Sequence, residues 1–113
     1  MIGDCQTMAA EANVLRIPCV RFNDFVYRIG YLNDLENNYQ LGYGIKPNNP
    51  GQLLDTVQSI LSMPNRKEVF VQRHQKMLSE KIDTAAFLTW FIENYPQSVQ
   101  TMKQNPEFQN KFR

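Results

Sequence analysis

The chain has 113 residues, with 12 lysines and arginines against 11 aspartates and glutamates, which allows one domain with a modest core. A net charge this close to zero gives no electrostatic reason to expect nucleic acid or an anionic membrane surface as a partner. No apolar run approaches the roughly 20 residues that span a bilayer, and no signal peptide is recognisable. Two cysteines, Cys5 and Cys19, are too few for a disulfide framework, so we expect reduced thiols in a cytoplasmic protein.

The first half of the sequence predicts short strands that alternate with helices. Apolar residues at helical spacing predict the helices, and short runs with β-branched residues predict buried strands. The expected elements are a strand end at 1–3, a helix at 7–15, a strand at 17–22, a helix at 29–39 with Leu32 and Leu35 turned inward, and a strand at 41–45. Strand, helix and strand in this order predict a parallel sheet. Because the sequence opens on a strand end, we expect a preceding part of the domain to be missing.

The second half predicts helices only. Asn49 and Asp83 are expected to cap two of them, the first beginning at Pro50 with Gln52 placed for a reciprocal capping bond. A helix is expected from about residue 66 to 81 and a polar tail from Asn105 onward. Pro96 is expected either to end the helix capped by Asp83 or to begin a short helix to about 104. One face of the helix that begins at Pro50 is expected to be buried through Leu53, Leu54, Val57, Ile60 and Leu61.

These elements predict an α/β, partial Rossmann-like fold with two or three short parallel strands followed by several C-terminal helices. We expect a single truncated domain over 1–113, with βα units in 1–63 and a helical segment in 64–113. A complete parallel sheet of this kind would have more strands and helices on both faces.

The corner between the first strand and the first helix is the candidate binding site. Ligands bind at the carboxyl ends of parallel strands in such folds, and free N–H groups at a helix start favour phosphate. The corner offers the amides of Gln6, Thr7 and Met8, with the Thr7 hydroxyl beside them. Glu11 lies one turn later, where its carboxylate could accept hydrogen bonds from ribose hydroxyls.

The segment GDCQTMAAEA, residues 3–12, followed by Leu15 and Pro18, resembles the sugar-nucleotide corner of the GT-B superfamily. UDP-N-acetylglucosamine 2-epimerases carry a corner similar to D-S-G-G-x-Q-E-E-A followed by L-G-x-P. A prokaryotic family of GT-B-like proteins has a still more similar corner, G-D-S-Q-T-M-A-A-E-A. Stretches similar to residues 21–25, 29–32 and 91–96 also occur in that family, so the resemblance covers most of this chain but only the C-terminal third of a family member.

The resemblance implies a nucleotide sugar such as a UDP-sugar as ligand, and an isomerase or glycosyltransferase as the intact parent. It assigns Glu11 to the ribose and places Cys5 where the relatives usually have serine. Gln6 and Thr7 replace the two glycines of the epimerases, and Cys5 is a weaker hydrogen-bonding group than serine. We therefore expect weak UDP binding. Most of the acidic groups and the histidine that epimerases use belong to regions that this chain lacks.

Further polar side chains are expected near the same corner. Arg21, Asn23 and Arg28 are expected on the loop after the second strand, as sugar or phosphate contacts or as ordinary loop polarity. Cys5 could be a nucleophile with a lowered pKa at a helix start, although a serine replacement explains it better. No resident cofactor is expected, and no spacing of ligands indicates a metal site.

An alternative to the enzyme parent is a non-catalytic, truncated module that forms oligomers and binds no ligand. An open sheet edge invites pairing with another chain. The segment 87–95 also carries more large apolar residues than one helix in a small domain can bury, namely Phe87, Leu88, Trp90, Phe91, Ile92 and Tyr95. A homo-oligomer is expected under either interpretation.

Overall fold

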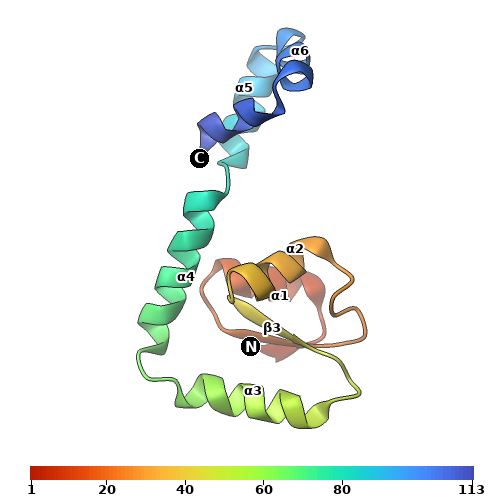
Figure 1. The fold of residues 1–113 in the computed structure, drawn as a ribbon, viewed down its shortest axis with the longest axis vertical. Coiled ribbons are helices and arrows are strands. Elements are labelled where there is room, and N and C mark those ends of the chain that lie inside the picture. The colour runs from red at the N-terminus through yellow and green to blue at the C-terminus, as the bar shows by residue number, and fades with distance from the viewer. The chain divides into compact units, whose positions relative to one another are not determined.

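The computed structural model describes all 113 residues, and the chain forms two compact units, Met1–Gln75 and Lys76–Arg113. The first unit combines helices with a small parallel sheet, and the second unit is helical (Figure 1). The predicted α/β class is therefore confirmed. None of the helices combines the length and apolar character needed to cross a membrane.

The sheet has three strands in the order β1-β2-β3. These are β1 (Ile2–Gly3), β2 (Cys19–Phe22) and β3 (Gly42–Ile45), and both neighbouring pairs are parallel. Val20 is aligned with Ile2 on one side and with Tyr43 on the other. All three carboxyl ends therefore lie at the same edge of the sheet.

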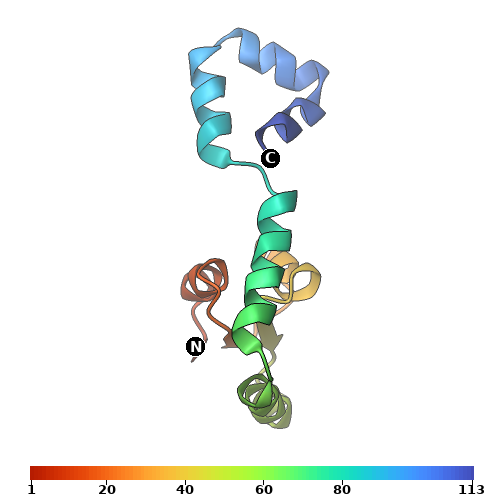
Figure 2. The same ribbon diagram turned by 90° about the vertical axis from the view of Figure 1, so that its left-hand side faces the viewer.

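Helices cover both faces of this sheet. α1 (Gln6–Val14) and α2 (Gly30–Asn33), which continues into a π-helical turn at Asp34–Asn38, lie on one side, and α3 (Pro50–Ser62) lies on the other (Figures 1 and 2). Leu32 and Leu35 are buried as predicted. The side chain of Asn49 accepts a hydrogen bond from the Gln52 amide at 3.2 Å, which confirms the predicted cap of α3.

The two faces of the sheet are packed differently. On the α3 face, Val20 and Ile45 form a buried aliphatic cluster with Ile60. On the other face, β3 presents Gly42 and Gly44, and a Cβ atom added at either would lie 2.6 Å from a side-chain oxygen of Asn13 or Glu36, respectively. Glycine suits both positions of β3 because a side chain there would displace the polar group of Asn13 or Glu36 that lies over the backbone.

The predicted buried face of α3 is too wide. Ile60 is buried and Leu53 and Val57 are half-buried, but Leu54 and Leu61 are each 70% exposed. Leu54 and Leu61 lie one position beyond Leu53 and Ile60, at the margin of the apolar stripe. A three-stranded sheet is too narrow to cover them.

The helix α4 (Arg66–Glu80) begins within the first unit. Phe70 is 1% exposed, and the Arg73 guanidinium donates to the Gln40 carbonyl at 2.8 Å and contacts the Tyr43 hydroxyl at 3.1 Å. The helical segment is expected to begin at residue 64, whereas the first unit extends to Gln75. The first turns of α4 thus contribute to the unit that contains the sheet.

The second unit contains α5 (Thr84–Glu93), α6 (Gln97–Gln104) and a 3-10 helix at Pro106–Phe112. The Asp83 side chain accepts from the Ala86 amide at 3.0 Å, which confirms the predicted cap of α5. The expectation of a polar tail after Asn105 is wrong. The tail forms the 3-10 helix and turns back toward the start of α5 (Figure 2), where the Phe112 carbonyl accepts a hydrogen bond from the Asp83 amide at 2.6 Å.

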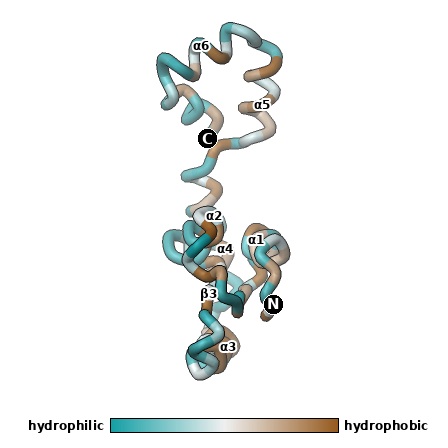
Figure 3. The backbone as a smooth tube through the Cα atoms, turned by 90° about the vertical axis from the view of Figure 1, so that its right-hand side faces the viewer, coloured by the Kyte–Doolittle hydropathy of each residue, from teal (hydrophilic) through white to brown (hydrophobic).

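An aromatic cluster holds this unit together. Trp90 is central, with ring centroids 4.7 Å from Phe108 and 5.6 Å from Phe112, and the cluster comprises Phe87, Trp90, Phe91, Phe108 and Phe112. Figure 3 shows brown, hydrophobic stretches along α5, and no residue of this helix is buried. Leu88, Ile92 and Tyr95 are exposed, in agreement with the expectation that this segment carries more apolar surface than it can bury.

Candidate functional site

The β1–α1 corner leaves the start of α1 without a side-chain cap. Cys5 is the N-cap residue in extended conformation, and its side chain makes no capping hydrogen bond. The first bond within the helix runs from the Ala9 amide to the Cys5 carbonyl at 3.1 Å. The amides of Gln6, Thr7 and Met8 therefore have no partner within the helix, and no acidic residue stands in the first turn. The helix dipole adds a partial positive charge at this end.

The residues predicted for the corner lie around this helix start. Cys5, Thr7 and Met8 are exposed and Gln6 is half-buried. Glu11 is also exposed, and it shares a helix face with Thr7 because the two are four residues apart. The corner can therefore offer backbone donors, a hydroxyl and a carboxylate to a solute.

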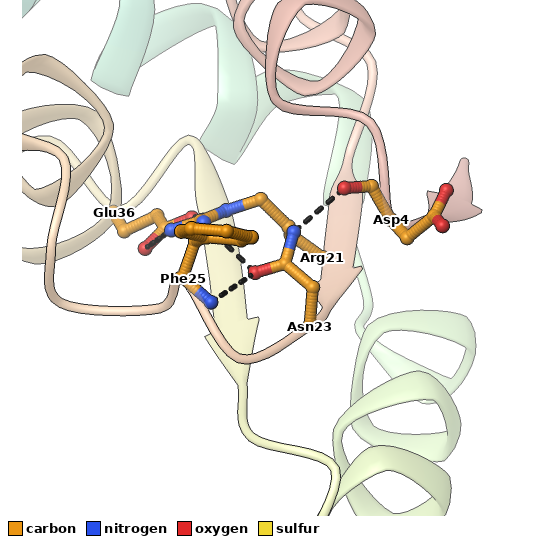
Figure 4. Close-up of polar contacts among 5 residues, drawn as sticks. All are labelled: Asp4, Arg21, Asn23, Phe25 and Glu36. Atoms are coloured by element: carbon orange, nitrogen blue, oxygen red, sulfur yellow. Dashed lines mark hydrogen bonds and ion pairs between the residues drawn. The ribbon is translucent and has the colours of Figure 1, made fainter.

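Asn23 is tied directly to this corner. Its Nδ2 donates to the Asp4 backbone carbonyl at 2.6 Å, and its Oδ1 accepts from the Phe25 amide at 3.0 Å and from Arg21 Nη1 at 3.3 Å (Figure 4). The structure thus brings Asn23 to the corner, as the sequence analysis expects. Its hydrogen bonds, however, go to protein groups.

Arg21 lies within β2, not on the loop that follows the strand. Its side chain is 1% exposed and forms a two-pronged ion pair with Glu36, with Nε–Oε1 at 2.9 Å and Nη2–Oε2 at 3.1 Å. The expected sugar or phosphate contact through Arg21 does not fit this placement, because the guanidinium is engaged inside the unit. Arg28, the third residue of that group, is exposed, and no hydrogen bond of its side chain ties it to the corner.

Glu36 is the member of this network that was not predicted from the sequence. It follows the inward Leu35 and lies four residues after the inward Leu32. This spacing places it on the buried face of the helix. A carboxylate on an inward face requires a buried cation. Arg21, a charged residue in a largely apolar strand, is the sequence signal for that cation.

A cavity of the first unit lies away from the corner. Its volume is about 690 Å³, and Pro18 in its wall directly precedes β2, which places it toward the amino-terminal ends of the strands. The other lining residues are Leu15, Arg16, Leu61, Met63, Asn65, Arg66, Lys67, Glu68, Phe70 and Val71. None of the predicted site residues lines this cavity.

Two other kinds of site can be assessed directly. No group of three or more histidine, cysteine, aspartate or glutamate side chains is placed to hold a metal ion. Cys19 is buried, and this burial raises the pKa of its thiol, so it is a packing residue and not a reactive one. Cys5 is the exposed thiol of the chain.

Comparison of the chain with protein-family models, with curated proteins and with solved structures finds no match. The corner itself and the sequence motif that it carries are therefore the features that bear on function.

Proposed function

We propose that this chain is the C-terminal part of a GT-B-like sugar-nucleotide protein and contributes part of the site for the nucleotide diphosphate. The uncapped start of α1 at the carboxyl edge of a parallel sheet is the observation that carries the proposal. The motif around it supports the same assignment, because it is similar to the corner of UDP-N-acetylglucosamine 2-epimerases and related glycosyltransferases.

In this proposal the corner binds the nucleotide and does not perform the chemical step. The amides of Gln6, Thr7 and Met8 receive the diphosphate, with the Thr7 hydroxyl as a further donor. Glu11 accepts hydrogen bonds from the ribose hydroxyls. The groups assigned to the corner are all used in binding, so epimerisation or transfer of the sugar is left to residues outside it.

A second candidate is a non-catalytic, self-associating module without a ligand. The apolar residues left exposed favour it, since Leu54 and Leu61 on α3 and Ile92 on α5 are each at least 70% exposed. This candidate predicts that the corner stays empty at any nucleotide concentration.

Calorimetric titration with UDP separates the two candidates. We expect a Kd no tighter than the millimolar range, which corresponds to about −4 kcal/mol, because Cys5, Gln6 and Thr7 stand where the epimerase corner has a serine and two glycines. Glu11→Ala should abolish the binding. Glu93→Ala is the matched control, since Glu93 is an exposed helical glutamate of the other unit, and it should leave the affinity unchanged.

Uridine serves as the second titrant because it lacks the diphosphate. Binding of uridine as strong as that of UDP would remove the helix start from the site. Absence of UDP binding by the unaltered chain would contradict the proposal and favour the ligand-free module. An anion-soaked crystal with an anion at the amides of residues 6–8 would support the assigned position directly.

A further inference from the structure

We infer that the buried Arg21–Glu36 ion pair acts as a positioning device for the β1–α1 corner, and that Asn23 transmits its effect. The three side chains and the Asp4 carbonyl form a continuous series of hydrogen bonds from the π-helical turn to the start of α1 (Figure 4). The effect of this series on nucleotide binding rests on the proposed function. The effect of this series on the geometry of the corner is independent of the proposed function.

The series begins where the π-helical turn holds Glu36 against β3. Glu36 is 8% exposed, and its Oε2 lies so close to Gly44 that an added Cβ there would be 2.6 Å away. The missing side chain at Gly44 lets the carboxylate lie over β3 and reach Arg21 in the neighbouring strand β2. Both carboxylate oxygens are bonded to the guanidinium, which fixes the plane of that group.

The fixed guanidinium then sets the orientation of Asn23. Nη1 of Arg21 and the Phe25 amide are both donors, and both point to the same atom, Oδ1 of Asn23. A reversed amide group would direct its own N–H donors at these two donors. The Nδ2 group must therefore face the other way, where it meets the Asp4 carbonyl at 2.6 Å.

The Asp4 carbonyl belongs to the peptide group that also contains the Cys5 amide. In a planar trans peptide the N–H points opposite to the C=O. Fixing the Asp4 oxygen toward Asn23 therefore directs the Cys5 N–H away from Asn23 and holds the N-cap residue in place. This constraint acts on the residue directly before the three unpaired amides of α1.

The test uses Asn23→Asp in the full chain, because aspartate keeps the two acceptor bonds but cannot donate to Asp4 when ionised. In NMR spectra we expect the chemical shifts of the Cys5 and Gln6 backbone amides to change, and those of the α3 amides to stay the same. Asn49→Asp is the matched control: Asn49 caps α3, so its substitution should move the α3 resonances and leave the corner unchanged. Unmoved Cys5 and Gln6 resonances in Asn23→Asp would overturn the inference.

A double-variant comparison tests whether the ion pair acts through Asn23. Glu36→Gln should move the Cys5 and Gln6 resonances in the unaltered chain and add no further movement in the Asn23→Asp background. Equal additional movement in both backgrounds would overturn the inference. If Glu36→Gln does not fold, Arg21→Lys replaces it, because lysine keeps the charge beside Glu36 but has no second nitrogen to reach Asn23.

UDP titration of the same variants separates this inference from the proposed function. Asn23→Asp should weaken UDP binding about fivefold, the factor that corresponds to one ordinary hydrogen bond. If the chemical shifts of Cys5 and Gln6 change but the UDP affinity does not, the claim that the series positions the ligand site is overturned. Moved resonances in a chain that binds no UDP at all would support the positioning device and contradict the proposed function.

Discussion

The two units differ in how many side chains they bury completely. The first unit, Met1–Gln75, fully buries several, among them Phe70, Leu32, Leu41 and the charged Arg21. In the second unit, Lys76–Arg113, Ser98 is the one fully buried side chain. The first unit places residues between a sheet and helices on both of its faces. The second unit instead brings half-buried aromatic rings of α5 against those of the 3-10 helix. A unit this short cannot enclose a core fully.

This difference locates the stability of each unit in a different kind of interaction. In the first unit, loss of a single buried partner leaves a charge or a cavity that water cannot reach. In the second unit, a lost ring is partly replaced by solvent. Substitutions of comparable size should therefore be more costly in the first unit than in the second.

The largest expected effect follows removal of one member of the buried ion pair. Glu36→Ala leaves the Arg21 guanidinium buried without a counter-charge and should lower the free energy of unfolding by about 3–5 kcal/mol. Urea unfolding followed by circular dichroism measures it. The double substitution Arg21→Met with Glu36→Leu is the control, because it removes both charges and should recover most of the loss. A loss below about 1 kcal/mol for Glu36→Ala would mean that the pair behaves as an exposed one.

A smaller effect is expected in the aromatic cluster. Phe112→Ala removes an edge-to-face contact with Phe87 and a contact with Trp90. It should cost about 2 kcal/mol, below the range of about 3–5 kcal/mol for fully buried aromatic residues. The chain has one tryptophan, so the fluorescence of Trp90 reports on this unit specifically.

Leu88→Ala is the matched control in the same unit, since Leu88 is 50% exposed and belongs to α5. It should cost less than Phe112→Ala. A cost for Phe112→Ala as large as that for Glu36→Ala would contradict the contrast between the two units.

Local signals in the sequence predict the elements well but not their partners. The caps at Asn49 and Asp83 depend on residues three positions apart, so they can be recognised without the fold. The burial of Leu54 and Leu61 is mispredicted because helical periodicity gives the direction of an apolar face but not the width of the sheet that covers it. The 3-10 helix is missed because its contact with Asp83 joins residues far apart in the sequence.

The candidate site shows the same limit. The motif makes Cys5, Gln6, Thr7, Met8 and Glu11 candidate residues because they are contiguous or one turn apart at the start of one helix. The strand predicted at 17–22 contains Arg21, but its side chain is assigned to the loop and the corner because its partner, Glu36, is on another element. A cation near the end of a strand is expected on the loop when no buried carboxylate is known. Arg21 can be buried in β2 because the π-helical turn holds its ion-pair partner, Glu36, over the neighbouring strand β3.

The smallest expected effect on folding, and the sharpest comparison of the two units, concerns their exposed apolar residues. Substitution of such residues should change the free energy of unfolding by no more than about 0.5 kcal/mol, but it should change the state of association. We expect light scattering at micromolar concentration to show a dimer or larger oligomer, because monomers rarely leave large contiguous apolar patches open. Burial of about 800 Å² per partner is an ordinary stable interface.

Two matched double variants assign the interface to one unit. Leu54→Glu with Leu61→Glu places charges on α3, and Leu88→Glu with Ile92→Glu places them on α5. Because the sheet unit also has open strand edges, we expect the α3 variant to dissociate the oligomer more completely than the α5 variant. Dissociation by the α5 variant alone would assign the interface to the second unit, where it would cover rings and aliphatic groups that the short unit cannot bury. A monomer of the unaltered chain would mean that both units tolerate their exposed apolar residues, and would remove self-association as a role for this surface.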